Sequence, residues 1–332
     1  MRFNMQEGHK PPVVVIDLGG TKTIAAIISH PPQVVAKEYF LTLADEGMEA
    51  VTGRIFSAID RLLSAENIEP SQLHSISIAA AGAIDPERGV VTLSPNLPGW
   101  RDIPLRDIFN KRYKVNTVLI NDANAEALGE HRLGAGKGVD SLILITVGTG
   151  IGGGIIINGR LYTGASGSAG EVGHITIDVN GPRCSCGNTG CWETLASGRA
   201  MAREAKGRVS RGEKSILTEM VKGEIEEITT EKIGAAAGEG DPLALEVISR
   251  AGTYLGIGMV NLVNIFNPEM IIVGGGVAKM GELLLEPARR VVRERAFKLA
   301  AEVVRIVPTQ LGDDGGVLGG AVFAYSLTGD MG

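Results

Sequence analysis

The chain has 332 residues, of which 44% are hydrophobic and 21% are charged, values that are ordinary for a soluble globular protein. This length exceeds what one hydrophobic core usually serves, so we expect two domains or lobes. A net charge of −6 at pH 7 and the lack of basic runs argue against a nucleic-acid partner, because such binding depends on clustered Lys and Arg.

Residues 1–12 are polar and contain no apolar stretch resembling a signal peptide. The longest candidate for a membrane span, residues 260–277, is interrupted by three asparagines, a proline and a glutamate. A spanning helix needs about 18 apolar residues with few interruptions. We therefore expect a cytoplasmic protein without a membrane partner.

The first half of the chain begins with a strand, a glycine turn and a second strand. An apolar, β-branched run at 13–17 stops at Gly19-Gly20, and another apolar run follows at 24–28. Apolar residues at helical spacing across 48–63 predict an amphipathic helix. Short buried strands are predicted at 76–80 and 118–120, and a helix is expected to begin just after the second.

The second half repeats this pattern, with a strand at 142–147, a glycine turn at 148–154 and a strand at 155–157. Two such units suggest a duplicated architecture whose halves face each other. Strands alternating with helices indicate an α/β fold, and we expect the boundary between the halves within 134–140. The remaining elements expected downstream are helices at 194–206, 243–266, 279–297 and 316–325, and strands at 270–273 and 303–307.

The turn after the first strand has the chemistry of a phosphate-binding loop. Glycines let backbone N–H groups close on phosphate oxygens, and threonine hydroxyls add donors. A lysine supplies positive charge, and an aspartate can hold Mg²⁺ through water. An ordinary glycine hairpin is the alternative interpretation. The residues expected around ATP here are Asp17, Gly19, Gly20, Thr21, Lys22 and Thr23.

The glycine-rich segment 146–154 is the second candidate for phosphate binding. We expect Thr149 and Gly150 near ATP, because so many glycines cost folding entropy that a close ligand would justify. A bulged strand or flexible turn is the alternative. Gly275 and Gly276 follow a third apolar run, and the three glycine turns together predict a nucleotide site.

All three cysteines of the chain lie in one short segment, which points to metal ligation. Cys184, Cys186 and Cys191 together with His174 make a Cys₃His set that suits tetrahedral Zn²⁺. Four protein ligands leave no open position for water, so we expect a structural zinc site. A cluster of buried free cysteines is the alternative.

Several polar residues are candidates for sugar binding and catalysis. Asn121-Asp122 ends a strand, and a kinase acting on an alcohol needs a carboxylate to accept the hydroxyl proton; an isolated Asp there would more often be a helix N-cap. Glu171 and Glu193 flank the cysteine segment and can bind sugar hydroxyls, or they are solvated surface charges. Asn96 lies in a turn-rich loop that either binds a polyol or is ordinary surface.

These motifs together resemble the ROK (repressor, open reading frame, kinase) family of bacterial sugar kinases, most closely its ATP-dependent glucokinases, over residues 13–325. The resemblance implies an actin-like, ribonuclease-H-type fold of two lobes with the active site in the interlobe cleft. It places a small lobe at 12–134, to which a helix at 316–327 returns, and a large lobe with the zinc loop at 135–315.

The resemblance also assigns roles to residues, with Asp122 as the catalytic base and His174 as both a sugar contact and a zinc ligand. ATP is expected near 19–23, Thr149, Gly150, Gly275 and Gly276. The expected sugar contacts are Gly82, Asn96, Asn121, Asp122, Glu171, His174 and Glu193. Repressors of the family carry an N-terminal helix-turn-helix, and a first phosphate loop beginning at Asp17 leaves no room for one, so we do not expect repression.

We therefore predict ATP-dependent phosphorylation of the 6-hydroxyl of glucose, with ATP, Mg²⁺ and structural Zn²⁺ as cofactors. N-acetylmannosamine, N-acetylglucosamine, mannose and fructose stay open as alternative substrates, and a non-catalytic sugar sensor as an alternative function. Polyphosphate and ADP stay open as alternative donors. The family further suggests a homodimer or homotetramer.

Overall fold

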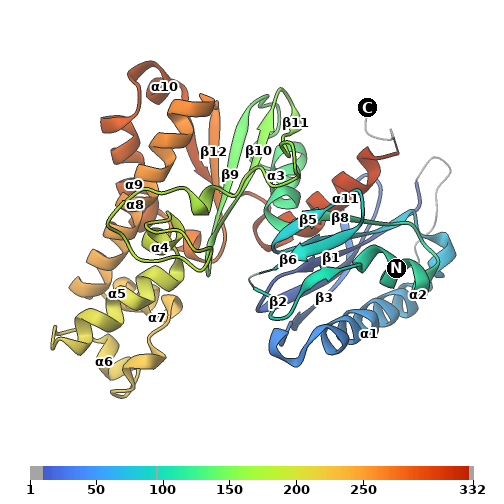
Figure 1. Ribbon diagram of the computed structural model, residues 1–332, viewed down its shortest axis with the longest axis horizontal. Coiled ribbons are helices and arrows are strands. Elements are labelled where there is room, and N and C mark those ends of the chain that lie inside the picture. The colour runs from blue at the N-terminus through green and yellow to red at the C-terminus, as the bar shows by residue number, and fades with distance from the viewer. Residues whose placement is uncertain (1–9, 95, 329–332) are drawn as a thin grey trace. The chain divides into compact units, whose positions relative to one another are not determined.

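The structure is a computed structural model that describes residues 10–94 and 96–328 (Figure 1). The described chain folds into two compact units. Unit 1 comprises residues up to 138, 154–170 and those from 310 onward, and unit 2 comprises 139–153 and 171–309. Both units combine a five-stranded sheet with helices, so the predicted α/β fold class is confirmed.

The sheet of unit 1 has the strand order β3-β2-β1-β4-β8. β1, β2 and β3 are antiparallel, whereas β4 and β8 run parallel to β1. A smaller three-stranded sheet has the order β5-β6-β7. The strands are β1 (Val13–Leu18), β2 (Lys22–Ile28), β3 (Val34–Leu41), β4 (Ser75–Ala80), β5 (Ala83–Asp85), β6 (Val90–Leu93), β7 (Arg101–Ile103) and β8 (Thr117–Asn121).

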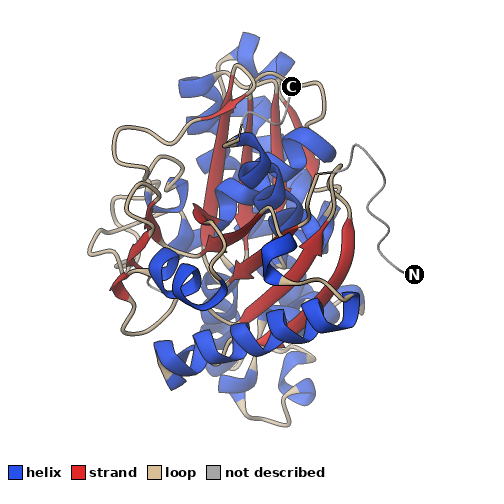
Figure 2. Cartoon of the chain, turned by 90° about the vertical axis from the view of Figure 1, so that its right-hand side faces the viewer, coloured by secondary structure: helices blue, strands red, loops and turns tan. Residues whose placement is uncertain are grey.

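Helices cover the faces of this sheet, as the blue helices around red strands in Figure 2 illustrate. Side chains of a strand alternate between the two faces, and β1 shows this directly. Ile16 is in the core that α1 and α2 close, whereas Val15 is in the core that α11 closes. The helices of unit 1 are α1 (Met48–Glu66), α2 (Leu105–Tyr113), α3 (Asp122–Leu133) and α11 (Gly315–Ser326).

Glycines allow α11 to pack very closely on α3. A Cβ atom at Gly319 would lie 1.7 Å from the carbonyl oxygen of Ala125, and one at Gly129 would lie 2.5 Å from the carbonyl oxygen of Gly315. No side chain fits at either contact, so these positions require glycine. The predicted helix at 316–325 is confirmed as α11.

Glu130, a buried residue of unit 1, forms hydrogen bonds beside two of the places where the chain passes between the units. The chain crosses between the units four times, and two of these crossings lie between 138 and 139 and between 309 and 310. Glu130 of α3 is fully buried, and its carboxylate accepts hydrogen bonds from the backbone N–H groups of Ala135, Gln310 and Leu311 at 2.8, 2.9 and 2.7 Å. One carboxylate therefore anchors the unit 1 side of both crossings.

The second sheet has the order β11-β10-β9-β12-β13, which repeats the chain order of the first sheet. When the strands of each sheet are numbered in the order in which the chain reaches them, both sheets have the spatial order 3-2-1-4-5. The duplication of the strand pattern is therefore confirmed. The strands are β9 (Leu142–Val147), β10 (Ile151–Ile157), β11 (Arg160–Leu161), β12 (Met270–Gly274) and β13 (Arg305–Pro308).

The helices of unit 2 pack around the long helix α8. Within the described part of the chain, α8 is the one helix long and apolar enough to cross a membrane by length and composition. Of its most apolar stretch 56% is buried inside the structure, which is typical of a core helix. The helices are α4 (Glu193–Ala196), α5 (Gly198–Ser210), α6 (Leu217–Met220), α7 (Thr230–Gly238), α8 (Pro242–Phe266), α9 (Glu282–Arg295) and α10 (Lys298–Val303).

Several predicted elements have different bounds. The helix expected at 194–206 is split at Ser197, whose side chain caps α5 by accepting from Ala200 N–H. The helix expected from 279 begins only at Glu282, because Gly281 has a left-handed φ of 61°. The strand expected from 303 begins at Arg305, because α10 continues through Val303.

The sequence interpretation also missed whole elements, among them β3 and α2. β3 is an edge strand whose outer side chains include Tyr39, 53% exposed, and Leu41, 54% exposed, so it lacks a clean apolar alternation. α2 is short and has the charged sequence LRDIFNKRY. Both elements are held by tertiary packing against α1 and the sheet rather than by a strong local pattern.

Candidate active site

Unit 1 places the first glycine turn at the end of β1, as predicted. The N–H of Gly19 donates to the carbonyl oxygen of Lys22 at 3.0 Å, which closes the turn. Thr21 and Lys22 are exposed, and the Lys22 ammonium nitrogen lies 5.5 Å from the centre of the Tyr39 ring. Thr23 is fully buried, so its hydroxyl faces the interior of the unit.

Asp17 lies beneath this turn, close to Asp122. Burial, and after it the charge of Asp122, raise the pKa of Asp17 to about 7. The two carboxyl groups are thus near enough to interact. A Cβ atom at Gly316 would lie 2.6 Å from a carboxylate oxygen of Asp17, so the start of α11 packs against this side chain.

Asn121, and not Asp122, caps helix α3. The Asn121 side-chain oxygen accepts from the N–H of Asn124 at 3.1 Å, and its amide donates to the carbonyl oxygen of Gly82 at 3.2 Å. The N-cap role considered for Asp122 therefore belongs to Asn121. Asp122 is the first residue of α3, with Oδ1 accepting from the N–H of Ala123 at 2.9 Å.

Gly82 and Asn96 adjoin these residues within unit 1. Gly82 has a left-handed φ of 108°, and a Cβ there would lie 2.4 Å from the carbonyl oxygen of Leu93. Asn96 is exposed, and a Cβ at Gly20 would lie 2.7 Å from the Cβ of Asn96. Gly20 of the first glycine turn thus packs against Asn96, and Gly82 packs against Leu93 while its carbonyl is bound by Asn121.

Unit 2 holds the remaining candidates, and its glycine turn is shorter than predicted. Ile151 already begins β10, so the turn is confined to 148–150, with Thr149 exposed. A Cβ at Gly150 would lie 2.0 Å from Oε2 of Glu193, and one at Gly154 would lie 2.5 Å from the Cβ of Ala127. The view that these glycines lack a packing reason was therefore wrong.

The third glycine turn lies beside the second. Gly275 has a left-handed φ of 87°, and a Cβ there would lie 2.4 Å from the carbonyl oxygen of Val147. Gly275 and Gly276 are exposed. The N–H of Gly198 donates to the carbonyl oxygen of Gly148 at 2.8 Å, so the start of α5 also closes on the second turn. Unit 2 thus brings two of the predicted phosphate turns together.

The predicted zinc ligands form one cluster. The ligand atoms of His174, Cys184, Cys186 and Cys191 all lie within 4.8 Å of one another. His174 Nδ1 lies 3.6 Å from Cys184 Sγ, and Cys186 Sγ lies 3.7 Å from Cys191 Sγ. Ligands bound at about 2.0–2.3 Å around a tetrahedral ion are separated by similar distances. The four residues therefore fit a zinc ion.

The cluster sits in a tightly folded loop. Backbone bridges join Thr176 with Cys191 and Arg183 with Thr189. Gly190 has a left-handed φ of 68°, and a Cβ there would overlap the carbonyl oxygen of Asp178 at 1.6 Å. Burial raises the pKa of the Cys191 thiol to about 12. A bound cation would favour the thiolate instead.

Both carboxylates predicted to contact sugar adjoin this cluster. His174 turns Nδ1 to the sulfurs, while its Nε2 lies 3.9 Å from Oε2 of Glu171. Glu193 lies within 4.0 Å of Cys184 Sγ through Oε1, and its Oε2 accepts from the N–H of Ile151 at 3.1 Å. Between Cys191 and Glu193, the fully buried Trp192 donates its indole N–H to the carbonyl oxygen of Tyr254 at 3.0 Å.

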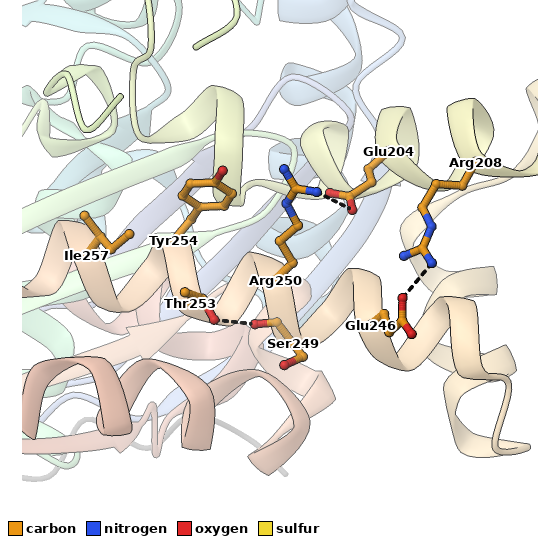
Figure 3. Close-up of a pocket in the computed structure, with 8 residues that line it drawn as sticks. All are labelled: Glu204, Arg208, Glu246, Ser249, Arg250, Thr253, Tyr254 and Ile257. Carbon is orange, nitrogen blue, oxygen red and sulfur yellow. Dashed lines mark hydrogen bonds and ion pairs between the residues drawn. The ribbon is translucent and has the colours of Figure 1, made fainter. Parts of the chain in front are cut away.

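A separate hollow of about 550 Å³ lies between α5 and α8, in a region that no motif indicated (Figure 3). Its charges are paired with one another. Arg208 donates to Glu246 at 2.6 Å, and Arg250 lies 3.5 Å from Glu204. The hollow is open, and these pairs neutralise its cations, so it shows no chemistry for a particular ligand.

Two residues near the first glycine turn were not identified from the sequence. Burial and the charges of neighbouring carboxylates raise the pKa of Glu126 to about 8. A signal for it exists, because Asp122, Glu126 and Glu130 recur every four residues and share one face of α3. Thr42 contacts the turn directly, yet it follows an edge strand that has no pattern to mark it.

The ROK family model matches residues 13–326. The chain is 38% identical to a glucokinase of Halalkalibacterium halodurans, which covers 92% of this chain and 93% of the relative. It is 35% identical to a glucokinase of Thermotoga maritima, over 93% of this chain and 96% of the relative. It is also 38% identical to a xylose repressor of Caldicellulosiruptor bescii, over 92% of this chain and 76% of that protein.

Among solved structures, the chain is similar to a ROK family glucokinase from Streptomyces griseus in complex with glucose and AMPPNP. The identity is 36% and the TM-score is 0.85, with 95% of this chain and 99% of that chain covered. These comparisons confirm the predicted resemblance and the predicted actin-like fold.

Proposed function

Because the chain belongs to the ROK family, we propose that it phosphorylates the 6-hydroxyl of glucose with ATP and that Asp122 is the general base. The glucokinase relatives and the glucokinase structure support the coarser activity, an ATP-dependent sugar kinase. The observation that carries the finer proposal is that Asp122 lies close enough to Asp17, at the end of β1 just before the first glycine turn, for the two carboxyl groups to interact, while the same turn packs against Asn96.

The proposed role of unit 1 is to hold phosphate and to activate the sugar hydroxyl. Asp122 accepts the proton of the 6-hydroxyl and orients its oxygen toward the γ-phosphorus. Residues 19–23 surround the phosphates, and backbone N–H groups at the tip of the turn donate to them. Asp17 would hold Mg²⁺ through water, and the bound ion would neutralise phosphate charge. Since the pKa of Asp17 is about 7, a nearby cation would favour its ionised form.

The proposed role of unit 2 is to bind both substrates from one packed group of loops. Glu171, His174 and Glu193 bind sugar hydroxyls, while Thr149, Gly150, Gly275 and Gly276 contact the nucleotide. The sugar contacts proposed within unit 1 are Gly82, Asn96 and Asn121. Zn²⁺ on the Cys₃His cluster would stiffen the loop that carries His174 and Glu193, because all four of its positions are filled by protein.

A sugar panel tests the substrate. ADP formation from ATP should be measured with glucose, mannose, fructose, N-acetylglucosamine and N-acetylmannosamine, and we expect the highest kcat/KM with glucose. Buried polar sites discriminate against an analogue that lacks a bound hydroxyl by up to about 10⁴-fold. A higher kcat/KM with any other sugar contradicts the glucose assignment, and ATP should be compared with polyphosphate and ADP as donors in the same assay.

A matched pair of variants tests the base. Asp122→Asn should bind glucose with unchanged Kd and lose about 10²–10⁴-fold in kcat. The exposed Asp107→Asn should behave as wild type. Wild-type turnover in Asp122→Asn excludes Asp122 as the base.

A non-catalytic sugar-responsive protein is the second candidate, favoured by the 38% identity to a xylose repressor. Sugar binding by calorimetry with no ADP formation from any sugar would favour it. The cytoplasmic location and the homodimer or homotetramer stay predictions, and light scattering on the purified protein would test the assembly.

A further inference from the structure

Thr42 is a fully buried residue that directly follows the edge strand β3 and contacts the first glycine turn three times. Its backbone N–H donates to the carbonyl oxygen of Thr21 at 2.9 Å. Its hydroxyl donates to the carbonyl oxygen of Gly19 at 2.7 Å and lies 2.8 Å from the hydroxyl of Thr23. Thr42 therefore links the end of β3 to the first glycine turn.

The direction of each hydrogen bond follows from the number of hydrogens present. The Thr42 hydroxyl has a single hydrogen, which it gives to the Gly19 carbonyl. In the pair with Thr23, the Thr23 hydroxyl must therefore be the donor. The result is a buried chain from Thr23 through Thr42 to the Gly19 carbonyl, with every hydroxyl hydrogen used.

These bonds fix which way the backbone of the turn faces. In a trans peptide the N–H of one residue points opposite to the carbonyl of the residue before it, and the peptide bonds of this turn are trans. Thr42 draws the carbonyls of Gly19 and Thr21 toward the interior. The N–H groups of Gly20 and Lys22 consequently point away from Thr42.

Thr42 is itself held from helix α1. The Arg54 guanidinium donates to the carbonyl oxygen of Thr42 at 2.6 Å and to that of Leu43 at 3.1 Å, and it pairs with Glu46. Leu43 has a left-handed φ of 48°, which turns the chain sharply after Thr42. Thr42 therefore connects the packing of α1 to the orientation of the glycine turn.

We propose that Thr42 is a positioning residue for the phosphoryl donor, which keeps the N–H group of Gly20 directed at the nucleotide phosphates. This inference rests on the proposed nucleotide role of the turn. Thr42 touches the backbone rather than the substrate, so its effect is on donor binding and not on the acceptor sugar.

The test compares Thr42→Val, which removes the hydroxyl at nearly constant volume, with Thr42→Ser, which keeps it. Thr42→Val should raise the Kd for AMPPNP and the KM for ATP by about tenfold, the usual effect of one buried hydrogen bond of this kind. The KM for glucose should change less than twofold. Thr42→Ser should keep the Kd for AMPPNP and the KM for ATP close to the wild-type values. Thr23→Val should raise both values less than Thr42→Val does, because the hydrogen bond from Thr42 to the Gly19 carbonyl remains.

Thr52→Val is the matched control, because Thr52 is also a buried threonine whose hydroxyl donates to a backbone carbonyl, that of Met48 at 2.8 Å within α1. An unchanged AMPPNP Kd in Thr42→Val, an equal rise in both KM values, or the same loss in Thr52→Val would each overturn the proposal. If Thr42→Val does not fold, Thr42→Cys serves in its place. The AMPPNP Kd is measured without sugar, so it tests Thr42 even if wild-type protein phosphorylates no sugar and the glucokinase proposal fails.

Discussion

Oε2 of Glu193 accepts a hydrogen bond from the backbone N–H of Ile151 at 3.1 Å. Ile151 directly follows Gly150, and a Cβ at Gly150 would lie 2.0 Å from the same oxygen. A carboxylate proposed to bind sugar and a turn proposed to bind nucleotide are thus packed against each other. The two binding events are therefore expected to respond together to changes at this contact.

Gly150→Ala should raise the KM values for glucose and for ATP together, each by about tenfold or more. The added methyl group must displace Glu193, and loss of its charged hydrogen bond to Ile151 adds to the effect. Steady-state kinetics with each substrate varied in turn provide the measurement. Gly53→Ala on the exposed face of α1 is the control, since a Cβ there meets nothing within 4 Å. A rise in only one of the two KM values would show that the contact does not couple them.

Cys186→Ala should lose bound zinc and lower the thermal midpoint of unfolding by several degrees. Three ligands hold a structural ion far less well than four, and Glu193 lies only two residues beyond the last cysteine ligand. Elemental analysis and thermal melting give the two readouts. Ser185→Ala, an exposed neighbour outside the ligand set, should match wild type. Zinc-free wild-type protein with unimpaired stability would contradict the zinc prediction.

Glu126→Gln should stabilise the ligand-free protein at alkaline pH. The pKa of Glu126 is raised from 4.5 to about 8 by burial first and then by neighbouring carboxylates. Between these values the folded chain keeps a proton that the unfolded chain has released, so the free energy of unfolding falls as pH rises. The amide cannot titrate. We expect the variant to resemble wild type near pH 4.5 and to gain about 1–3 kcal/mol at pH 8.

Urea unfolding at pH 5, 6.5 and 8 checks this expectation. Part of the pH dependence should survive in Glu126→Gln, because the pKa of Asp17 is also raised, to about 7. Glu294→Gln, an exposed change on α9, should leave the wild-type profile intact. A Glu126→Gln profile parallel to that of wild type would show that Glu126 does not retain its proton in the folded state.

Glu130→Ala should destabilise the protein by about 2–4 kcal/mol, because three backbone N–H groups lose a charged acceptor. Hydrogen exchange should speed up at the amides of Ala135, Gln310 and Leu311. The first and the last of the four chain crossings are affected at once, so the peptide that contains Ala135 and the peptide that contains Gln310 and Leu311 should respond together. Faster exchange at only one of them, or a loss below 0.5 kcal/mol, would remove Glu130 as their common anchor.

The repeated strand, glycine turn and strand units, the Cys₃His donor set and the chemistry of the candidate site residues could all be predicted from the amino-acid sequence. These features depend on residue type and short spacing: β-branched runs form strands, and thiolates and imidazole bind soft cations. The sequence did not show which of Asn121 and Asp122 caps α3, because both residue types suit the position.

The contacts of several other residues could not be predicted from the sequence. Glu193 leaves no room for a side chain at Gly150, and Ala127 leaves none at Gly154. Thr42 bonds to Gly19, which is 23 positions away in the chain. Glu130 bonds to Leu311, which is 181 positions away. A buried hydrogen bond or close contact forms between whichever groups the packed elements bring together. Local pattern carries no information about that partner, so these contacts follow only from the folded chain.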